Sequence, residues 1–190
     1  SVTLVLVVVM TLFAFPTPVY AGDKPPIGEQ SAYAVFQNNS GAVGAQIGSD
    51  SSAVTVSPDQ YVFVCIQQDF TQAMKQHDMI GQWRTWGGEW QSMAVIGAGS
   101  STAWEYWNSN YTDHTADAVS DHFTDTVQGN YIFESDYTGY GDAYPPGEVT
   151  GKHETWFVIQ APSASAGSRF EIRWYDSEEP AALTPTVMVD

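Results

Sequence analysis

The chain has 190 residues, and its 22 acidic and 6 basic side chains give a formal net charge of −16 at pH 7. A surface of this charge repels the phosphates of nucleic acids and anionic membranes, so we expect neither as a partner. It favours a neutral ligand, such as a glycan or a cell-surface group, or cations, and it suits a marine or halophilic source.

The first residues differ in composition from the rest. The apolar run "SVTLVLVVVMTLFAF" is shorter than the roughly 20 residues that span a bilayer. Val19 and Ala21 fit the small-residue pattern that precedes a signal cleavage point. We therefore predict a truncated secretory signal peptide over 1–21, a linker over 22–31 and a single domain over 32–190. We expect such a protein to be secreted; the alternative locations are the periplasm and the cell surface.

Strand-like segments follow at short intervals, separated by Gly, Pro and Asn turns. The clearest alternation is in "RFEIRWY", where Phe170 and Ile172 face one way and Arg169 and Arg173 the other. The run 60–67 is apolar on both faces, which is typical of a central buried strand. This pattern predicts a mainly β fold, an antiparallel β-sandwich that is jelly-roll-like with one or two short helices. The predicted strands are 32–38, 53–57, 60–67, 91–97, 103–107, 130–136, 154–160, 169–176 and 185–189.

Two stretches have helical spacing. In residues 69–83, Phe70, Met74 and His77 lie about one helical turn apart. In residues 113–129, Val119, Phe123 and Val127 lie at i, i+4 and i+8 with aspartates on the opposite side. We predict a short helix in the first stretch and an amphipathic helix with an acidic outer face in the second.

The segment "QWRTWGGEWQ", residues 82–91, predicts a β-hairpin. Gly87 and Gly88 both tolerate positive φ and can form its two-residue turn. Arg84 then pairs with Gln91, and Thr85 pairs with Trp90. This register places Trp83, Thr85 and Trp90 on one face, which we expect to be core, and Arg84, Trp86, Glu89 and Gln91 on the other.

The second face of this hairpin is the first candidate binding site. An indole covers the apolar side of a sugar ring, and polar groups orient its hydroxyls. We therefore predict that Trp86 stacks on a ligand while Arg84 and Glu89 orient it. The alternative is that Trp86 packs on Arg84 as a cation–π pair, or on a neighbouring loop.

The loop 134–148 is the second candidate. Tyr137, Tyr140 and Tyr144 offer large, stiff, half-polar contact area between glycines, a composition that binding loops use. We predict a second ligand-binding patch there; the alternative is that the tyrosines fold back on the sheet. Two further segments, at Asn38 and Asn110, carry the N-x-S/T pattern of glycosylation sites.

Signals for catalysis and metal binding are weak. His114, Asp117 and Asp121, with Asp113 nearby, match no metal motif, and a solvated acidic stripe is the preferred interpretation. We predict no metal and no cofactor. Cys65, the single cysteine, lies in an apolar run and is interpreted as a small buried hydrophobe.

The sequence therefore predicts a secreted, non-catalytic binding module for carbohydrate or a cell surface, acting through exposed aromatic side chains. The first alternative is a secreted glycoside hydrolase or lyase on the same sandwich, which needs two carboxyl groups roughly 5–10 Å apart. Its candidate carboxylates are Glu105, Glu134, Asp136, Glu154 and Glu171. The second alternative is a filament or envelope subunit that retains 1–21 as an apolar helix.

Overall fold

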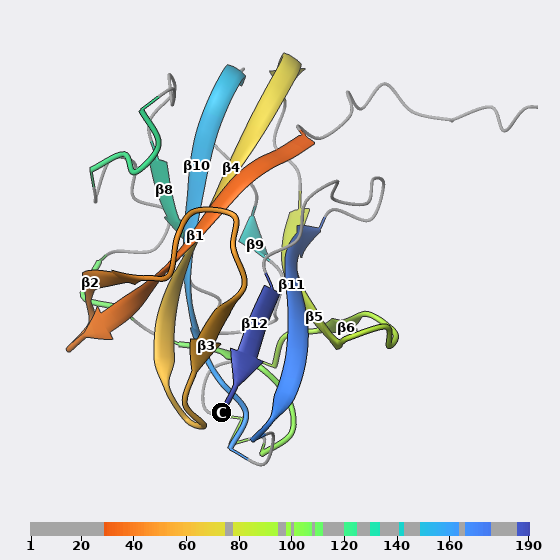
Figure 1. Ribbon diagram of the computed structural model, residues 1–190. Helices are drawn as coiled ribbons and strands as arrows, with labels where there is room; N and C mark the ends of the chain where they lie inside the picture. Colours follow the sequence, from red (N-terminus) through yellow and green to blue (C-terminus); the bar gives the residue numbers. More distant parts are fainter. Residues whose placement is uncertain are drawn as a thin grey trace, which may run out of the picture.

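The computed structural model describes residues 29–74, 78–94, 98–99, 101–107, 109–111, 120–124, 130–133, 141–142, 149–163, 166–175 and 186–190. These ranges contain strands and turns and no helix (Figure 1), so they hold no candidate for a membrane-spanning helix. The strands are β1 (Glu29–Asn39), β2 (Ala42–Ile47), β3 (Val54–Val56), β4 (Tyr61–Met74), β5 (Asp78–Thr85), β6 (Gln91–Ser92), β7 (Glu105–Tyr106), β8 (Asn130–Phe133), β9 (Gly141–Asp142), β10 (Val149–Gln160), β11 (Ser168–Tyr175) and β12 (Thr186–Val189).

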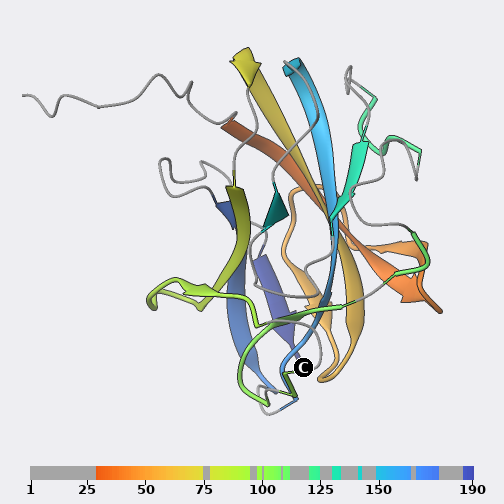
Figure 2. The ribbon, with the colours of Figure 1, turned by 180° about the vertical axis from the view of Figure 1, so that it is seen from behind.

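The strands form two six-stranded sheets, which are seen from opposite sides in Figures 1 and 2. The first has the order β2-β1-β4-β10-β7, with β8 also paired to β10, and the second has the order β3-β12-β11-β5-β6, with β9 also paired to β5. Two pairs, β8 with β10 and β3 with β12, are parallel, and the other pairs between named strands are antiparallel. The predicted antiparallel-rich β-sandwich is confirmed.

The main core lies between the two sheets. Side chains from both sheets meet in one cluster of buried residues, among them Val64 of β4, Phe157 of β10 and Ile172 of β11. On β4, Val62, Val64 and Ile66 belong to this cluster, and the intervening side chains belong to a second one on the outer side of the first sheet. The predicted burial of residues 60–67 on both faces is confirmed for positions 62 to 67. The outer cluster comprises Ala34, Phe36, Phe63, Cys65, Phe123, Trp156 and Val158.

The predicted helix over 69–83 is wrong. β4 continues through Met74, where it still pairs with Val149 of β10, and β5 starts at Asp78. Pairing with long neighbouring strands overrides the helical spacing of three side chains. Of the predicted helix over 113–129, the described residues 120–124 form a bend and a turn, and the remainder lies outside the described residues.

The first described strand, β1, begins inside the segment that we assigned to a linker. Residues 29–31, which we assigned to a linker, belong to β1 and pair with β4, while the rest of that linker and residues 1–21 lie outside the described residues. The sequence analysis did not predict β2, which is rich in Gly and Ala and offers a weak strand signal. A tight turn places it beside β1. Ser40 (φ 54°) and Gly41 (φ 89°) form this turn, with the two positive φ angles of a type I′ hairpin.

Candidate functional site

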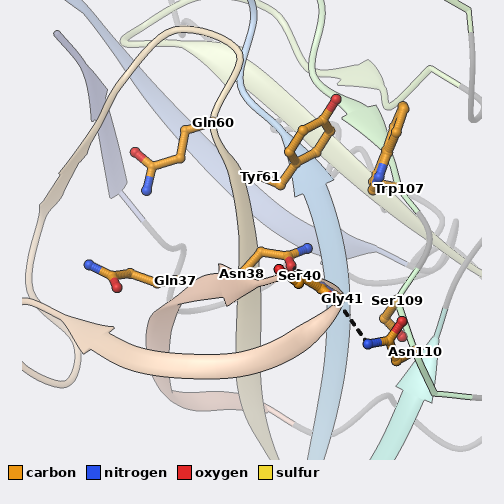
Figure 3. A pocket seen from close by; sticks show the side chains of 9 residues that line it. All are labelled: Gln37, Asn38, Ser40, Gly41, Gln60, Tyr61, Trp107, Ser109 and Asn110. Carbon is orange, nitrogen blue, oxygen red and sulfur yellow. Dashed lines mark hydrogen bonds between the residues drawn. The ribbon is translucent and has the colours of Figure 1, made fainter.

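A pocket of about 650 Å³ opens where the β1–β2 turn, the start of β4 and the segment after β7 meet (Figure 3). Tyr61 alternates along β4 with core-facing Val62, so the pocket belongs to the outer side of the first sheet. Its lining residues are Gln37, Asn38, Ser40, Gly41, Gln60, Tyr61, Trp107, Ser109 and Asn110.

Hydrogen bonds fix the shape of this pocket at the β1–β2 turn. The Asn38 side-chain oxygen accepts a hydrogen bond from the Gly41 N–H at 2.6 Å, which is an Asx-type closure of the turn. Asn110 then binds the turn twice: its backbone N–H donates to the Gly41 carbonyl at 2.7 Å and its Nδ2 donates to the Ser40 carbonyl at 2.8 Å. A Cβ on residue 41 would lie 2.5 Å from the Asn110 Oδ1, so glycine permits this close approach.

Two aromatic rings form one side of the pocket. The ring centroids of Tyr61 and Trp107 lie 4.5 Å apart, with 38° between the ring planes. Both side chains are half-buried, and Trp107 also packs against the outer hydrophobic cluster. The Trp107 backbone N–H donates to the Val158 carbonyl at 3.0 Å, which holds the segment after β7 against β10. The rings are therefore held in place before any ligand arrives.

The remaining lining groups are polar and neutral. They are the amides of Gln37, Asn38, Gln60 and Asn110 and the hydroxyls of Ser40 and Ser109, and none of the nine lining residues is charged. Figure 3 shows Gln37 and Gln60 across the pocket from Trp107 and Asn110. An aromatic surface beside neutral donors and acceptors can hold a flat, hydroxyl-rich molecule. Sequence reasoning missed this pocket, although the sequons at Asn38 and Asn110 marked two of its residues.

The tryptophan hairpin has a different register from the predicted one. Trp83 pairs with Gln91 and Gln82 with Ser92, one residue away from the predicted pairing. The turn is Thr85–Gly88, closed by a 2.8 Å hydrogen bond from the Gly88 N–H to the Thr85 carbonyl, with positive φ at Gly87. A shift of one residue moves side chains to the other face of a strand.

This shift corrects the predicted positions of the hairpin side chains. Trp83 is buried in the main core, as predicted. Trp90 and Thr85, which we also assigned to the core face, are half-buried and exposed respectively. Trp90 lies instead on the outer side, where the Arg84 and Arg173 guanidinium carbons are 4.4 and 4.1 Å from its ring centroid.

Of the predicted ligand-binding side chains of the hairpin, Arg84 and Trp86 lie on the outer face of the second sheet. Trp86 is 56 % exposed, and its ring lies 3.2 Å from the guanidinium carbon of Arg169 rather than of Arg84. Arg84 forms an ion pair with Glu171, and Glu89 is exposed. A ligand-binding role for these three residues stays a prediction. The other predicted patch, Tyr137, Tyr140 and Tyr144, lies outside the described residues.

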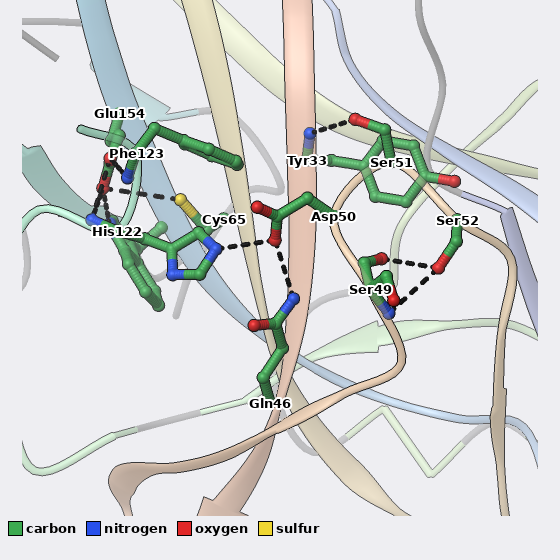
Figure 4. A network of polar contacts seen from close by, with 11 residues as sticks. Tyr33, Gln46, Ser49, Asp50, Ser51, Ser52, Cys65, His122, Phe123 and Glu154 are labelled. Carbon is green, nitrogen blue, oxygen red and sulfur yellow. Dashed lines mark hydrogen bonds and ion pairs between the residues drawn. The ribbon is translucent and has the colours of Figure 1, made fainter. Parts of the chain in front are cut away.

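A buried carboxylate organises a polar network on the outer side of the first sheet (Figure 4). Glu154 on β10 is fully buried and accepts hydrogen bonds from the backbone N–H groups of His122 at 2.9 Å and Phe123 at 2.7 Å, and from the Trp156 indole at 3.1 Å. The His122 ring lies 2.7 Å from an Asp50 carboxylate oxygen. Glu154 thereby joins the 120–124 segment to the sheet.

Cys65 lies in the same network and is buried, as predicted. Its thiol donates to a Glu154 carboxylate oxygen at 3.6 Å. Burial, reinforced by the nearby Glu154 charge, raises the pKa of the thiol well above its usual value of 9.0. The thiol is therefore held in its unreactive, protonated form.

The candidate catalytic carboxylates that lie within the described residues each have a hydrogen-bond or ion-pair partner in the protein. Glu105 accepts a hydrogen bond from the Gly99 N–H, Glu171 pairs with Arg84, and Glu154 is enclosed by its donors. None of the three lines the 650 Å³ pocket. Glu134 and Asp136 lie outside the described residues.

In the described ranges, no three His, Cys, Asp or Glu side chains gather to hold a metal ion. Of the acidic stripe, Asp121 is exposed and lines a smaller pocket of about 410 Å³ beside His122 and Trp156, while Asp113, His114 and Asp117 lie outside the described residues. Comparison of the chain with protein-family models, with curated proteins and with solved structures gives no match.

Proposed function

We propose that the protein is a non-catalytic carbohydrate-binding module, and that the pocket of Tyr61 and Trp107 holds a neutral sugar. The observation that carries this proposal is the chemistry of the lining: a fixed pair of aromatic rings and four amides, with no charged side chain among the nine described lining residues. A pyranose has an apolar C–H face for the rings and hydroxyl groups for the amides.

Three further features support binding rather than catalysis. The nine described lining residues include no Asp, Glu, His, Lys or Cys. Its size, about 650 Å³, suits a ligand of one or a few sugar units. The turn at Ser40 and Gly41 is fixed by hydrogen bonds from Asn110, so little conformational entropy is lost when a ligand binds.

The test is a screen of neutral glycans on an array, followed by titration calorimetry with the best binder. Trp107→Ala removes half of the aromatic side, and we expect a loss of about 2 kcal/mol, or roughly 30-fold in affinity. Gln37→Ala removes one amide from an exposed position and leaves the core intact, and we expect a loss of roughly 5-fold.

The matched control is Trp86→Ala, which removes an exposed indole from the second sheet. We expect this variant to bind the neutral glycan as the wild type does. Circular dichroism melts confirm that each variant is folded. If no neutral glycan binds, or if Gln37→Ala and Trp107→Ala both bind as the wild type does, the proposal is wrong.

A further inference from the structure

The outer face of the second sheet collects all three arginines of a strongly acidic chain. Arg169 and Arg173 alternate on β11 with Phe170 and Ile172, which belong to the core, and Arg84 lies beside core-facing Trp83 on β5. Neighbouring side chains on a strand point to opposite faces, so the three guanidinium groups share the outer face. The basic charge of the described sheets is therefore concentrated on one side.

The guanidinium groups are stacked on indoles. Arg84 and Arg173 both lie over Trp90, and Arg169 lies over Trp86. Stacking of this kind holds the planar guanidinium in a fixed orientation, which reduces the entropy lost when it binds an anion. We call this surface, made of Arg84, Trp86, Trp90, Arg169 and Arg173, the arginine–tryptophan face.

The three arginines differ in their partners. Arg84 forms an ion pair with Glu171, and Arg173 donates two hydrogen bonds to the Gln82 side-chain oxygen, at 2.9 and 2.6 Å. In the described residues, Arg169 has no carboxylate partner, and its Nε is buried without a hydrogen bond. Beneath it, Trp86 is the one large hydrophobic side chain of the described residues that is exposed. Arg169 and Trp86 therefore form the part of the face where a guanidinium has no carboxylate partner among the described residues and the indole that it stacks on is still 56 % exposed.

We propose that the arginine–tryptophan face binds a polysaccharide that carries carboxylate groups, with Arg169 pairing to a carboxylate and Trp86 contacting a sugar ring. Arg84 already holds a carboxylate on this face, that of Glu171, which shows that the surface accommodates this pairing. A planar guanidinium matches a carboxylate with two parallel hydrogen bonds. The chain as a whole carries a net charge of −16 and repels an anionic polymer, so the attraction is confined to this cluster of guanidinium groups.

This second site is independent of the neutral-sugar pocket. The pocket lies on the outer side of the first sheet and the arginine–tryptophan face on the outer side of the second, with the main core between them. Loss of binding at one site leaves the other unchanged, so a failure of this inference and a failure of the proposed function can be told apart.

Affinity electrophoresis tests the inference, with three polymers embedded in the gel: polygalacturonate, dextran sulfate and dextran. Ionic strength is held at about 0.15 M, where the screening length of about 8 Å limits repulsion from the distant acidic surface. We expect retardation by polygalacturonate and none by dextran. Arg169→Gln, which keeps a polar side chain without the charge, is expected to weaken the binding at least 10-fold, and Arg169→Lys, which keeps the charge without the planar group, at least 3-fold.

Gln46→Ala is the control, since Gln46 is an exposed residue of β2 in the other sheet, and we expect this variant to be retarded like the wild type. Binding that survives Arg169→Gln, or absence of binding to polygalacturonate, would overturn the inference. Retardation by dextran sulfate alone would overturn it as well, because sulfate would then be the recognised group. Thermal melts of the variants show that they are folded, so loss of binding reports on the face itself.

Discussion

The hydrogen bonds around Glu154 lead to a quantitative prediction for Glu154→Gln. The carboxylate accepts from two backbone N–H groups, those of His122 and Phe123, and from the Trp156 indole. Glutamine has nearly the same shape, but it replaces one acceptor oxygen with an NH₂ group that donates. At least one of the buried N–H groups then faces another donor.

The size of the effect follows from these contacts. A hydrogen bond to a charged group contributes about 1.5–3 kcal/mol, a neutral one about 0.5–1.5, and a buried donor without a partner costs about 1–3. The neutral amide relieves the desolvation of the buried carboxylate, which offsets part of the loss. We therefore expect Glu154→Gln to lower the free energy of unfolding by roughly 3 kcal/mol. For a domain of this size, that corresponds to a fall in Tm of roughly 6–12 °C.

Urea denaturation followed by tryptophan fluorescence measures this difference, and calorimetry gives the Tm. Glu89→Gln is the matched control, because Glu89 is exposed, and we expect it to stay within about 0.5 kcal/mol of the wild type. If Glu154→Gln also lies within about 1 kcal/mol of the wild type, the carboxylate does not hold the 120–124 segment in the way the geometry indicates.

Two further predictions concern the turn and the thiol. Gly41→Ala is expected to lower the free energy of unfolding by at least 1 kcal/mol more than Gly87→Ala does. Both glycines have positive φ, but only at residue 41 would a Cβ meet another side chain. Equal losses of stability in urea denaturation would contradict this. The raised pKa of Cys65 keeps the thiol protonated in the folded state, whereas the thiol of the unfolded chain ionises above about pH 9. The free energy of unfolding should therefore fall as the pH rises past that value, by at most about 1.4 kcal/mol per pH unit. Cys65→Ala should make this dependence on pH less steep. Iodoacetamide should label Cys65 only after unfolding, and rapid labelling of the folded protein would refute the burial.

The fold class follows from the sequence because strand alternation and turn residues are local signals. Residues 60–67 read as a strand buried on both faces, and the structure places β4 between two hydrophobic clusters. The helix expected over 69–83 failed because long-range pairing of β4 with β10 outweighs a weak local period. Nothing local in the sequence specifies how far a strand continues once its neighbour is in place.

The candidate sites were harder to predict for the same reason. Trp86 was correctly expected to be exposed, but the turn formed one residue earlier than Gly87-Gly88, which moved Trp90 to the outer side. The partner of Trp86, Arg169, lies on a strand far away in the chain. The neutral pocket joins three segments that are distant in sequence, so only tertiary structure brings Tyr61 and Trp107 together.

The position of β12 has a consequence for biosynthesis. This strand lies between β3 and β11, so it separates a strand made early in translation from one made late. During translation, Val54 and Val56 of β3 stay unpaired on this side until residues 186–189 have left the ribosome. Such distant pairing slows folding and leaves apolar edges open to wrong partners in the meantime. The edge of β3 therefore gains its pairing partner only after almost all of residues 29–190 have been made.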